Sequence, residues 1–166
     1  YGRDVKDLKM AHCSNISCSE ATITSPDRDN DMGQYASLAT GVDGLGIVSY
    51  YDATNKNLKV AHCSNVHCSE ATITTIDSTG DVGLYTSITH SRRGLPFISY
   101  YDATNDKLKV AHCSTLTCST SNPIAPQNVT GGGGLYTSST IGSDEGEIIS
   151  YYDVTNGQLK VLHCDI

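Results

Sequence analysis

The chain has 166 residues, with ten Tyr, one Phe and no Trp, and it is rich in Gly, Ser, Thr, Asp and Asn. Segments with helical periodicity are missing, and this composition is typical of an all-β protein with many turns. The formal net charge is −7 without a basic stripe, which argues against nucleic acid and anionic membranes as partners. No apolar run approaches the roughly 20 residues of a membrane span, so we expect no membrane insertion. The chain begins with Tyr and shows no signal peptide, so we expect a mature, processed product.

A repeat of about 50 residues runs through the whole chain. Residues 98–118 read ISYYDATNDKLKVAHCSTLTC, and residues 48–68 are almost identical. A copy at 149–164 contains only the first of the two cysteines, and a diverged copy occupies 1–18. Repeats of this length with four strands each are typical of β-propeller blades.

In chain order, strands are expected first at 8–13 and 20–25, as an N-terminal hairpin. One full unit then predicts strands at 84–90, 95–102 and 108–113, and its fourth strand is clearest in the preceding unit at 71–76. Short polar turns between them predict four-stranded antiparallel blades in an all-β, propeller-like fold. We expect a hairpin at 1–33 that completes a blade of its own or a neighbouring chain, blades at 34–83 and 84–134, and a third blade at 135–166 without its outer strand.

The segments G-L-Y-T-S, I-S-Y-Y-D-A-T-N and L-K-V-A-H, at 83–87, 98–105 and 108–112, resemble a repeat of bacterial and archaeal extracellular proteins. In those proteins such units are predicted to be β-propeller blades. The resemblance implies the fold for essentially the whole chain and implies no particular activity. This sequence differs from that repeat by its cysteine pairs and by its three units.

Seven cysteines form three C-x4-C pairs with one residue left over, which differs from the usual arrangement of zinc ligands. We expect one disulfide per unit, Cys13–Cys18, Cys63–Cys68 and Cys113–Cys118, and therefore an extracellular or cell-surface location. Closing such a short loop contributes about 2 kcal/mol. The remaining Cys164 is expected to make an intermolecular contact.

Alternating carboxylates at Asp27, Asp29 and Asp31 are similar to an oxygen-rich calcium loop. The next unit keeps only Asp77 and Asp81 of this pattern, and the third unit loses it. A motif that decays across close repeats favours a polar turn, so we expect no cofactor and keep calcium as the alternative.

Two N-glycosylation sequons begin at Asn15 and Asn128, both in expected loops. Whether they carry glycans depends on the source organism. They predict exposed positions in either case.

Histidine precedes a cysteine in every unit, and all ten tyrosines fall on repeat positions. For the histidines, a repeated structural role is favoured over a ring of metal or ligand contacts. The tyrosines are expected to fill the space between blades, with carbohydrate stacking by some of them as the alternative.

No residue set suitable for catalysis stands out, because no unique nucleophile lies beside a base. A sialidase-like enzyme would need clustered arginines, and the sequence offers only Arg3, Arg28, Arg92 and Arg93 at unrelated positions. We therefore predict a non-catalytic extracellular structural protein whose blades self-assemble into a fibre, sheath or multi-chain ring. A glycan-binding lectin or adhesin is the alternative, and a sialidase-like glycoside hydrolase is the third hypothesis.

Overall fold

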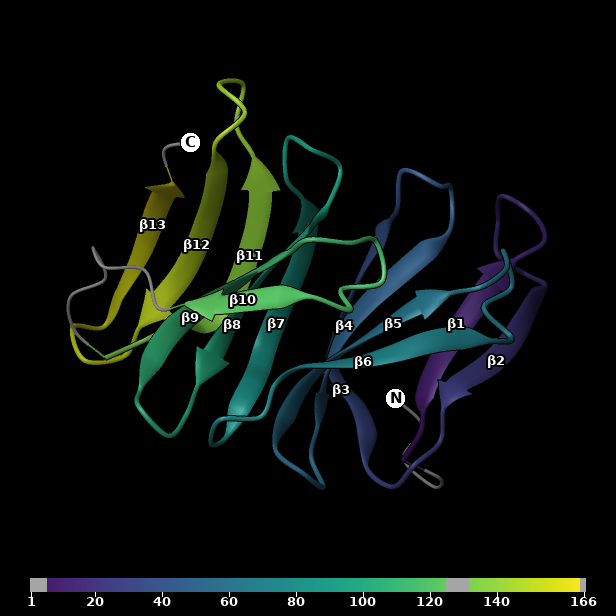
Figure 1. Cartoon of the computed structure of the whole chain (residues 1–166), viewed down its shortest axis with the longest axis horizontal. Helices are drawn as coiled ribbons and strands as arrows, with labels where there is room; N and C mark the ends of the chain where they lie inside the picture. Colours follow the sequence, from purple (N-terminus) through teal and green to yellow (C-terminus); the bar gives the residue numbers. More distant parts are fainter. Residues whose placement is uncertain (1–5, 125–131, 165–166) are drawn as a thin grey trace.

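A computed structural model describes residues 6–124 and 132–164, and these residues form thirteen β-strands and no helix (Figure 1). Consequently no helix in these ranges is long and apolar enough to cross a membrane. The strands are β1 (Leu8–Cys13), β2 (Ala21–Asp27), β3 (Met32–Thr40), β4 (Gly46–Asp52), β5 (Asn57–Cys63), β6 (Ala71–Asp77), β7 (Val82–His90), β8 (Pro96–Asp102), β9 (Lys107–Cys113), β10 (Ser121–Ile124), β11 (Leu135–Ile141), β12 (Glu147–Asp153) and β13 (Gln158–Cys164).

These strands form four antiparallel sheets in which sequence neighbours are also sheet neighbours. The hairpin β1–β2 is followed by the four-stranded sheets β3–β6 and β7–β10 and by the three-stranded sheet β11–β13. The predicted all-β architecture of four-stranded antiparallel units is confirmed. We call the contact of β1–β2 with β3–β6 the first seam, that of β3–β6 with β7–β10 the second seam, and that of β7–β10 with β11–β13 the third seam.

The inner strands β3, β7 and β11 lie next to one another along the series of sheets (Figure 1). Serine side chains connect them, because the amide of Ile88 donates to Ser37 Oγ at 3.1 Å. The amide of Ser139 donates to Ser87 Oγ at 3.0 Å in the same way. Each blade-like sheet is therefore fixed to the next at its inner edge.

Glycine permits this close approach at the start of each inner strand. Gly83 has a φ of +102°, and a Cβ atom there would lie 2.7 Å from the Cα of Leu58. Gly33 makes the same approach to Leu8. The glycine two residues before the inner-strand tyrosine, Gly33 before Tyr35 and Gly83 before Tyr85, is thus required by both backbone conformation and space.

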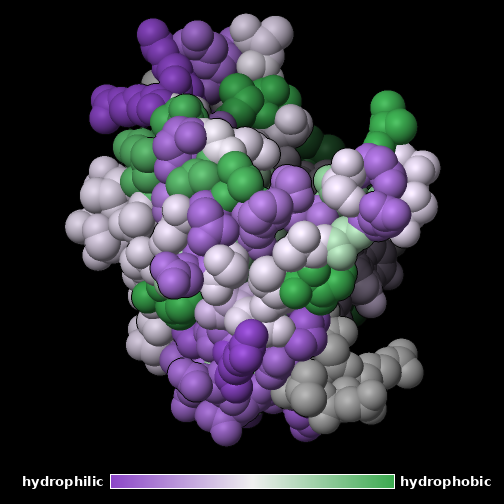
Figure 2. Space-filling model, turned by 90° about the vertical axis from the view of Figure 1, so that its right-hand side faces the viewer, coloured by the Kyte–Doolittle hydropathy of each residue, from purple (hydrophilic) through white to green (hydrophobic). Residues whose placement is uncertain are grey.

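In the sheets β3–β6 and β7–β10 the middle strands are largely buried on both faces, because a neighbouring sheet lies on each side. Tyr50 and Tyr100 are fully buried, as are Leu58 and Leu108, whereas the equivalent Leu159 on β13 is 76% exposed. At the other end, the face next to β1 and β2 shows separate apolar patches among hydrophilic residues (Figure 2).

Three disulfides close the loops that follow β1, β5 and β9. They are Cys13–Cys18, Cys63–Cys68 and Cys113–Cys118. Each links residues only five positions apart, so each stabilises one loop rather than a contact between sheets.

Candidate functional site

The aspartates of the suspected calcium loop stabilise the seams. At the first seam, Asp27 Oδ2 accepts hydrogen bonds from Tyr50 Oη at 2.5 Å and from Lys59 Nζ at 2.8 Å. Burial alone would raise the pKa of the Asp27 carboxyl, but the bonds from Lys59 and Tyr50 outweigh it and the pKa is lowered. Asp27 is therefore a buried anion with a structural role.

The second seam repeats this arrangement with Asp77, which accepts hydrogen bonds from Tyr100 Oη at 2.8 Å and from Lys109. Burial again opposes ionisation, and Lys109 again lowers the pKa of the Asp77 carboxyl overall. Within residues 6–124 and 132–164, no three His, Cys, Asp or Glu side chains are grouped so that they could hold a metal ion.

The remaining acidic residues of the motif are also used separately. Asp31 forms an ion pair with Lys6 at 3.1 Å, and Asp81 accepts a hydrogen bond from Tyr51 Oη at 2.7 Å. Asp29 is exposed. The five aspartates thus lie at successive seams and do not converge on one centre.

At the third seam the sequence has Gln127 where the second seam has Asp77, and Gln127 lies outside the described residues. Lys160, at the position of Lys59 and Lys109, pairs with Asp153 of its own sheet. This hydrogen bond lowers the pKa of Asp153 to about 2. The third seam therefore differs from the other two in the residue that the sequence places at this position.

A β-bulge near the start of each inner strand carries a tyrosine. On β3 the pairing register shifts between Gln34 and Ser37, and the same shift recurs on β7 and β11. The bulge residues Tyr35, Tyr85 and Tyr136 have φ values of 54°, 53° and 54°. An aromatic residue in this left-handed region is uncommon, and a bulge turns its side chain out of the normal alternation.

These three residues form a tyrosine row across the inner strands. The ring centroid of Tyr85 lies 4.6 Å from that of Tyr35 and 4.6 Å from that of Tyr136, with tilted planes. Tyr35 and Tyr136 remain 41% and 66% exposed, unlike the fully buried Tyr50 and Tyr100. The tyrosines therefore divide into a buried set between sheets and an accessible set.

A second layer of aromatic rings supports the tyrosine row. Tyr51 lies 6.2 Å from Tyr35, and Tyr101 lies 6.4 Å from Tyr85. Burial, together with the neighbouring phenols, raises the pKa of Tyr85 to about 12. At neutral pH Tyr85 is therefore an uncharged ring with a hydroxyl group that can donate and accept hydrogen bonds.

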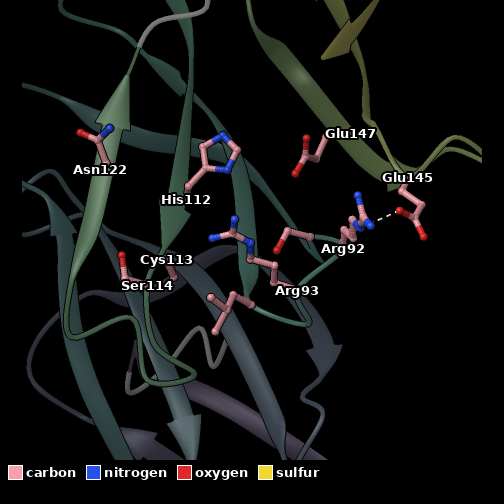
Figure 3. Close-up of a pocket in the computed structure, with 10 residues that line it drawn as sticks. Arg92, Arg93, His112, Cys113, Ser114, Asn122, Glu145 and Glu147 are labelled. Carbon is pink, nitrogen blue, oxygen red and sulfur yellow. Dashed lines mark ion pairs between the residues drawn. The ribbon is translucent and has the colours of Figure 1, made fainter. Parts of the chain in front are cut away.

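On a different part of the surface, a cleft of about 770 Å³ opens at the third seam (Figure 3). One wall of the cleft comes from the β7–β8 turn, the C-terminal end of β9 and the strand β10. The other comes from the β11–β12 turn and the start of β12. Arg92 Nε donates to Glu145 Oε2 at 2.7 Å, whereas Arg93 extends towards His112 (Figure 3). The polar side chains of this third-seam cleft are Ser91, Arg92, Arg93, His112, Ser114, Asn122, Glu145 and Glu147.

The cleft coincides with a break in the repeat. The position of Arg93 is acidic in the other units, where the side chain contacts the recurring histidine: Asp43 with His62 at 3.0 Å, and Asp144 with His163 at 2.8 Å. In the second unit the arginine removes this pair, and His112 contacts the ring of Phe97 edge-on at 4.9 Å.

Glu147 on the opposite wall is a second departure from the repeat, because the equivalent positions hold Gly46 and Pro96. Glu147 as a whole residue is only 9% exposed. Within the described ranges its carboxylate makes no hydrogen bond or ion pair. Figure 3 shows the side chain pointing from β12 into the cleft towards His112. The residue is thus mostly covered, while its carboxylate lines the open cleft, where a ligand can reach it.

The sequence provided a signal for this cleft that we did not use. We treated Arg92 and Arg93 as scattered, yet both belong to the one turn where the repeat loses its acidic residue. For the tyrosines, carbohydrate stacking was only the alternative to a role between blades. The row itself was not predicted, because periodicity does not reveal a left-handed bulge.

Two other sequence-based expectations concern exposed loops. Asn15 lies in the exposed first disulfide loop, where its side chain accepts a hydrogen bond from Ser17 Oγ at 2.9 Å. Asn128 lies outside the described residues. Cys164 ends β13 and is half-buried.

No protein-family model and no curated protein matches the sequence. Solved structures share the fold: a GH43 β-1,3-galactosidase superposes on 98% of this chain with a TM-score of 0.61 at 13% identity. An α-L-arabinofuranosidase from Fusarium graminearum matches 95% of the chain with a TM-score of 0.58, and a fucose lectin from Kordia zhangzhouensis matches 78% with a TM-score of 0.51, both at 13% identity. The chain spans 37% of the galactosidase and 48% of the arabinofuranosidase.

These matches support a propeller-type repeat fold, and they correct two predictions. We expected a non-catalytic structural protein and no enzyme, but the solved structures named above that share the fold are two glycoside hydrolases and a lectin. The carbohydrate-related hypotheses that we ranked second and third are therefore better supported. At this level of identity the likeness establishes the fold, and the activity is a matter for proposal.

Proposed function

We propose that the chain binds glycans through its tyrosine row and belongs to an extracellular carbohydrate-active propeller. The observation that carries this proposal is the exposure of Tyr35 and Tyr136 in a row of stacked rings on the inner strands, whereas Tyr50 and Tyr100 on β4 and β8 are fully buried. A purely structural role would bury all of these rings, as it does Tyr50 and Tyr100.

Sugar rings present C–H groups on their faces and hydroxyl groups around their edges. The faces can pack on the rings of the tyrosine row, and the hydroxyls can bond with the phenols and with Asp81 beside Tyr51. The fold neighbours, a galactosidase, an arabinofuranosidase and a fucose lectin, agree with a sugar as the ligand. Three disulfides support an extracellular setting.

A glycan array probed with the disulfide-bonded chain tests the proposal, followed by calorimetric titration of the sugars that bind. Removing one stacking ring costs about 1 kcal/mol, so Tyr136→Ala should weaken binding about fivefold. Tyr136→Phe should retain most of the stacking. Leu159→Ser, which removes an exposed apolar side chain on β13, is the matched control and should leave affinity unchanged. Equal affinities for all variants, or an array without any bound glycan, would refute the proposal.

Glycoside hydrolysis is a second candidate, favoured by Glu145 and Glu147 in one cleft. Glycosidases generally use two carboxyl groups, one as acid and one as nucleophile or base. Glu147 is nearly buried and Glu145 is held by Arg92. Release of nitrophenol from a panel of aryl glycosides, lost in Glu147→Gln, would support this candidate, and an inactive panel would remove it.

Three predictions remain proposals: the blade division at 34–83, 84–134 and 135–166, a contact between chains through Cys164, and glycans at Asn15 and Asn128. Intact mass of the native protein, with and without reductant, tests the second and third. Limited proteolysis tests the first, because cleavage should concentrate between the blades.

A further inference from the structure

We infer that the third-seam cleft is a second sugar site, separate from the tyrosine row, and that it takes a sugar bearing an anionic group, either a uronic acid or a sulfate ester. The inference relies on the proposed glycan binding only for the general class of ligand. The anionic group and the hydroxyls follow from the side chains of the cleft itself.

Arg93 supplies the recognition of the anion. Within the described residues it forms no ion pair, whereas its neighbour Arg92 is engaged with Glu145 at 2.7 Å. Figure 3 shows the Arg93 guanidinium directed towards His112 at the wall of the cleft. A guanidinium presents a planar set of donors that matches two oxygens of a carboxylate or a sulfate.

Glu147 supplies the recognition of the hydroxyls. Its carboxylate is an acceptor with several lone pairs, it is only 9% exposed, and no described side chain donates to it. Two adjacent sugar hydroxyls can both donate hydrogen bonds to this carboxylate. Asn122 and Ser114 line the same cleft and offer further donors and acceptors.

The balance of charge excludes simpler ligands. Arg92 and Arg93 are offset by Glu145 and Glu147, and the whole chain carries −7, so a small inorganic anion gains little from the overall field. A neutral sugar would leave Arg93 unused. A ligand with one charged group and a hydroxyl-bearing ring can bind both Arg93 and Glu147. The volume of the cleft lies within the range of about 300–1,000 Å³ that is typical of ligand sites.

The equivalent part of the second seam shows that the cleft is not a general property of the repeat. There Val42 lies against Gly94, with its Cγ1 2.5 Å from where a Cβ would be, and Asp43 contacts His62. Both recognition residues, Arg93 and Glu147, occur only where the repeat changes.

Calorimetric titration of the full disulfide-bonded chain tests the inference. The probes are methyl uronides of the gluco, galacto and manno series, each compared with its neutral parent and with the 6-sulfate. At least one anionic sugar should bind tenfold or more tightly than its parent, because a charge-assisted hydrogen bond is worth about that factor. Added salt should weaken this binding.

The variants separate this site from the tyrosine row. Arg93→Gln should abolish the preference for the anionic sugar, and Glu147→Gln should weaken binding of the same sugar about tenfold. Arg28→Gln, an exposed arginine near the first seam, and Tyr136→Ala should change neither. Preference for the carboxylate identifies a uronic acid, and preference for the 6-sulfate identifies a sulfated sugar.

An affinity equal to that of the neutral parents, or a preference that survives Arg93→Gln, would overturn the inference. Neutral sugars that still depend on Tyr136 would then leave the proposed function standing. If neither neutral nor anionic sugars bind, both proposals fail.

Discussion

The second and third seams join the same kinds of strands through the same kinds of turns, yet one is closed and the other opens into a cleft. At the second seam Asp43 contacts His62, and Asp77 binds Tyr100 and Lys109. At the third seam the sequence places Arg93 and Gln127 at the positions of Asp43 and Asp77. Two changes in a repeated framework are thus associated with an open, chemically distinct surface.

The difference shows where to look for function in a repeat protein. Residues that recur between units mostly stabilise the seams, as Asp27 and Asp77 do at the first two seams. Residues that break the recurrence, Arg93 and Glu147, lie in the cleft. The tyrosine row is an exception, because it recurs and yet remains exposed.

Breaking the buried network of the second seam should have the largest effect on stability. Asp77→Asn removes the anion that binds Lys109, and disrupting a buried pair of this kind costs about 3 kcal/mol of unfolding free energy. Urea denaturation measures the change. Asp144→Asn, whose partner His163 lies in an exposed pair, is the control and should change stability by less than about 0.5 kcal/mol. Similar losses in both variants would contradict the comparison.

Removing the disulfide after β5 or the one after β9 should lower the unfolding free energy by the same amount, about 2 kcal/mol, because the two closed loops have equal length. Thermal and urea unfolding of two double variants test this. One variant carries Cys63→Ser and Cys68→Ser, and the other carries Cys113→Ser and Cys118→Ser. Only the second pair should also alter sugar binding in the cleft, since Cys113 lines it. Identical effects on binding would argue that the cleft is not a site.

Acid should weaken the seams through the same aspartates. The pKa values of Asp27 and Asp77 lie below their ordinary value of 3.8 in the folded chain. Their contribution to stability is therefore complete above that value and is lost as the pH falls below it towards the folded-state pKa. Unfolding free energies measured from about pH 5 to about pH 2 should decrease, and less steeply in Asp77→Asn. Parallel profiles for the two proteins would contradict this assignment.

A smaller effect is expected from the second-seam ion pair. Asp43→Asn removes the carboxylate 3.0 Å from His62 Nε2. The pair is charged only when the histidine is protonated, so the loss should reach at most about 1 kcal/mol. Urea denaturation of the two proteins measures the difference. An unfolding free energy that the substitution leaves unchanged would show that this pair does not stabilise the fold.

The smallest change in stability should come from making the third seam more like the second. Arg93→Asp restores the acidic residue beside His112 at an exposed turn, so unfolding free energy should change by less than about 0.5 kcal/mol. Binding of the anionic sugar should nevertheless be lost. Retained binding in this variant would show that Arg93 is not the anion contact.

The fold could be predicted from the repeat because alternating strands and polar turns recur with every copy. β7 and β9 begin within two residues of their predicted starts, and β1 was predicted with its observed bounds. Periodicity of hydrophobic residues is a local property. It suffices to predict the strands here, because the contacts between sheets do not override the local preference.

The site was less predictable because it depends on non-local geometry. Alternation cannot show that Tyr85 sits in a left-handed bulge, nor that the turn holding Arg93 faces Glu147 on the next sheet. The spacing of Asp27, Asp29 and Asp31 suggested a cation, but their partners Lys59 and Lys6 come from other strands and segments. A comparison of the units position by position would have identified Arg93 and Glu147.

The short span of each disulfide also makes correct oxidation independent of the rest of the chain. Each native partner is five residues away, whereas every cysteine of another unit is at least 45 residues away. Loops of about ten residues close in roughly 10–100 ns, long before distant sheets can meet. Native thiols therefore find each other at a much higher effective concentration than incorrect ones. Each unit can be oxidised separately, so adding or removing such units would not increase the number of mispaired bridges.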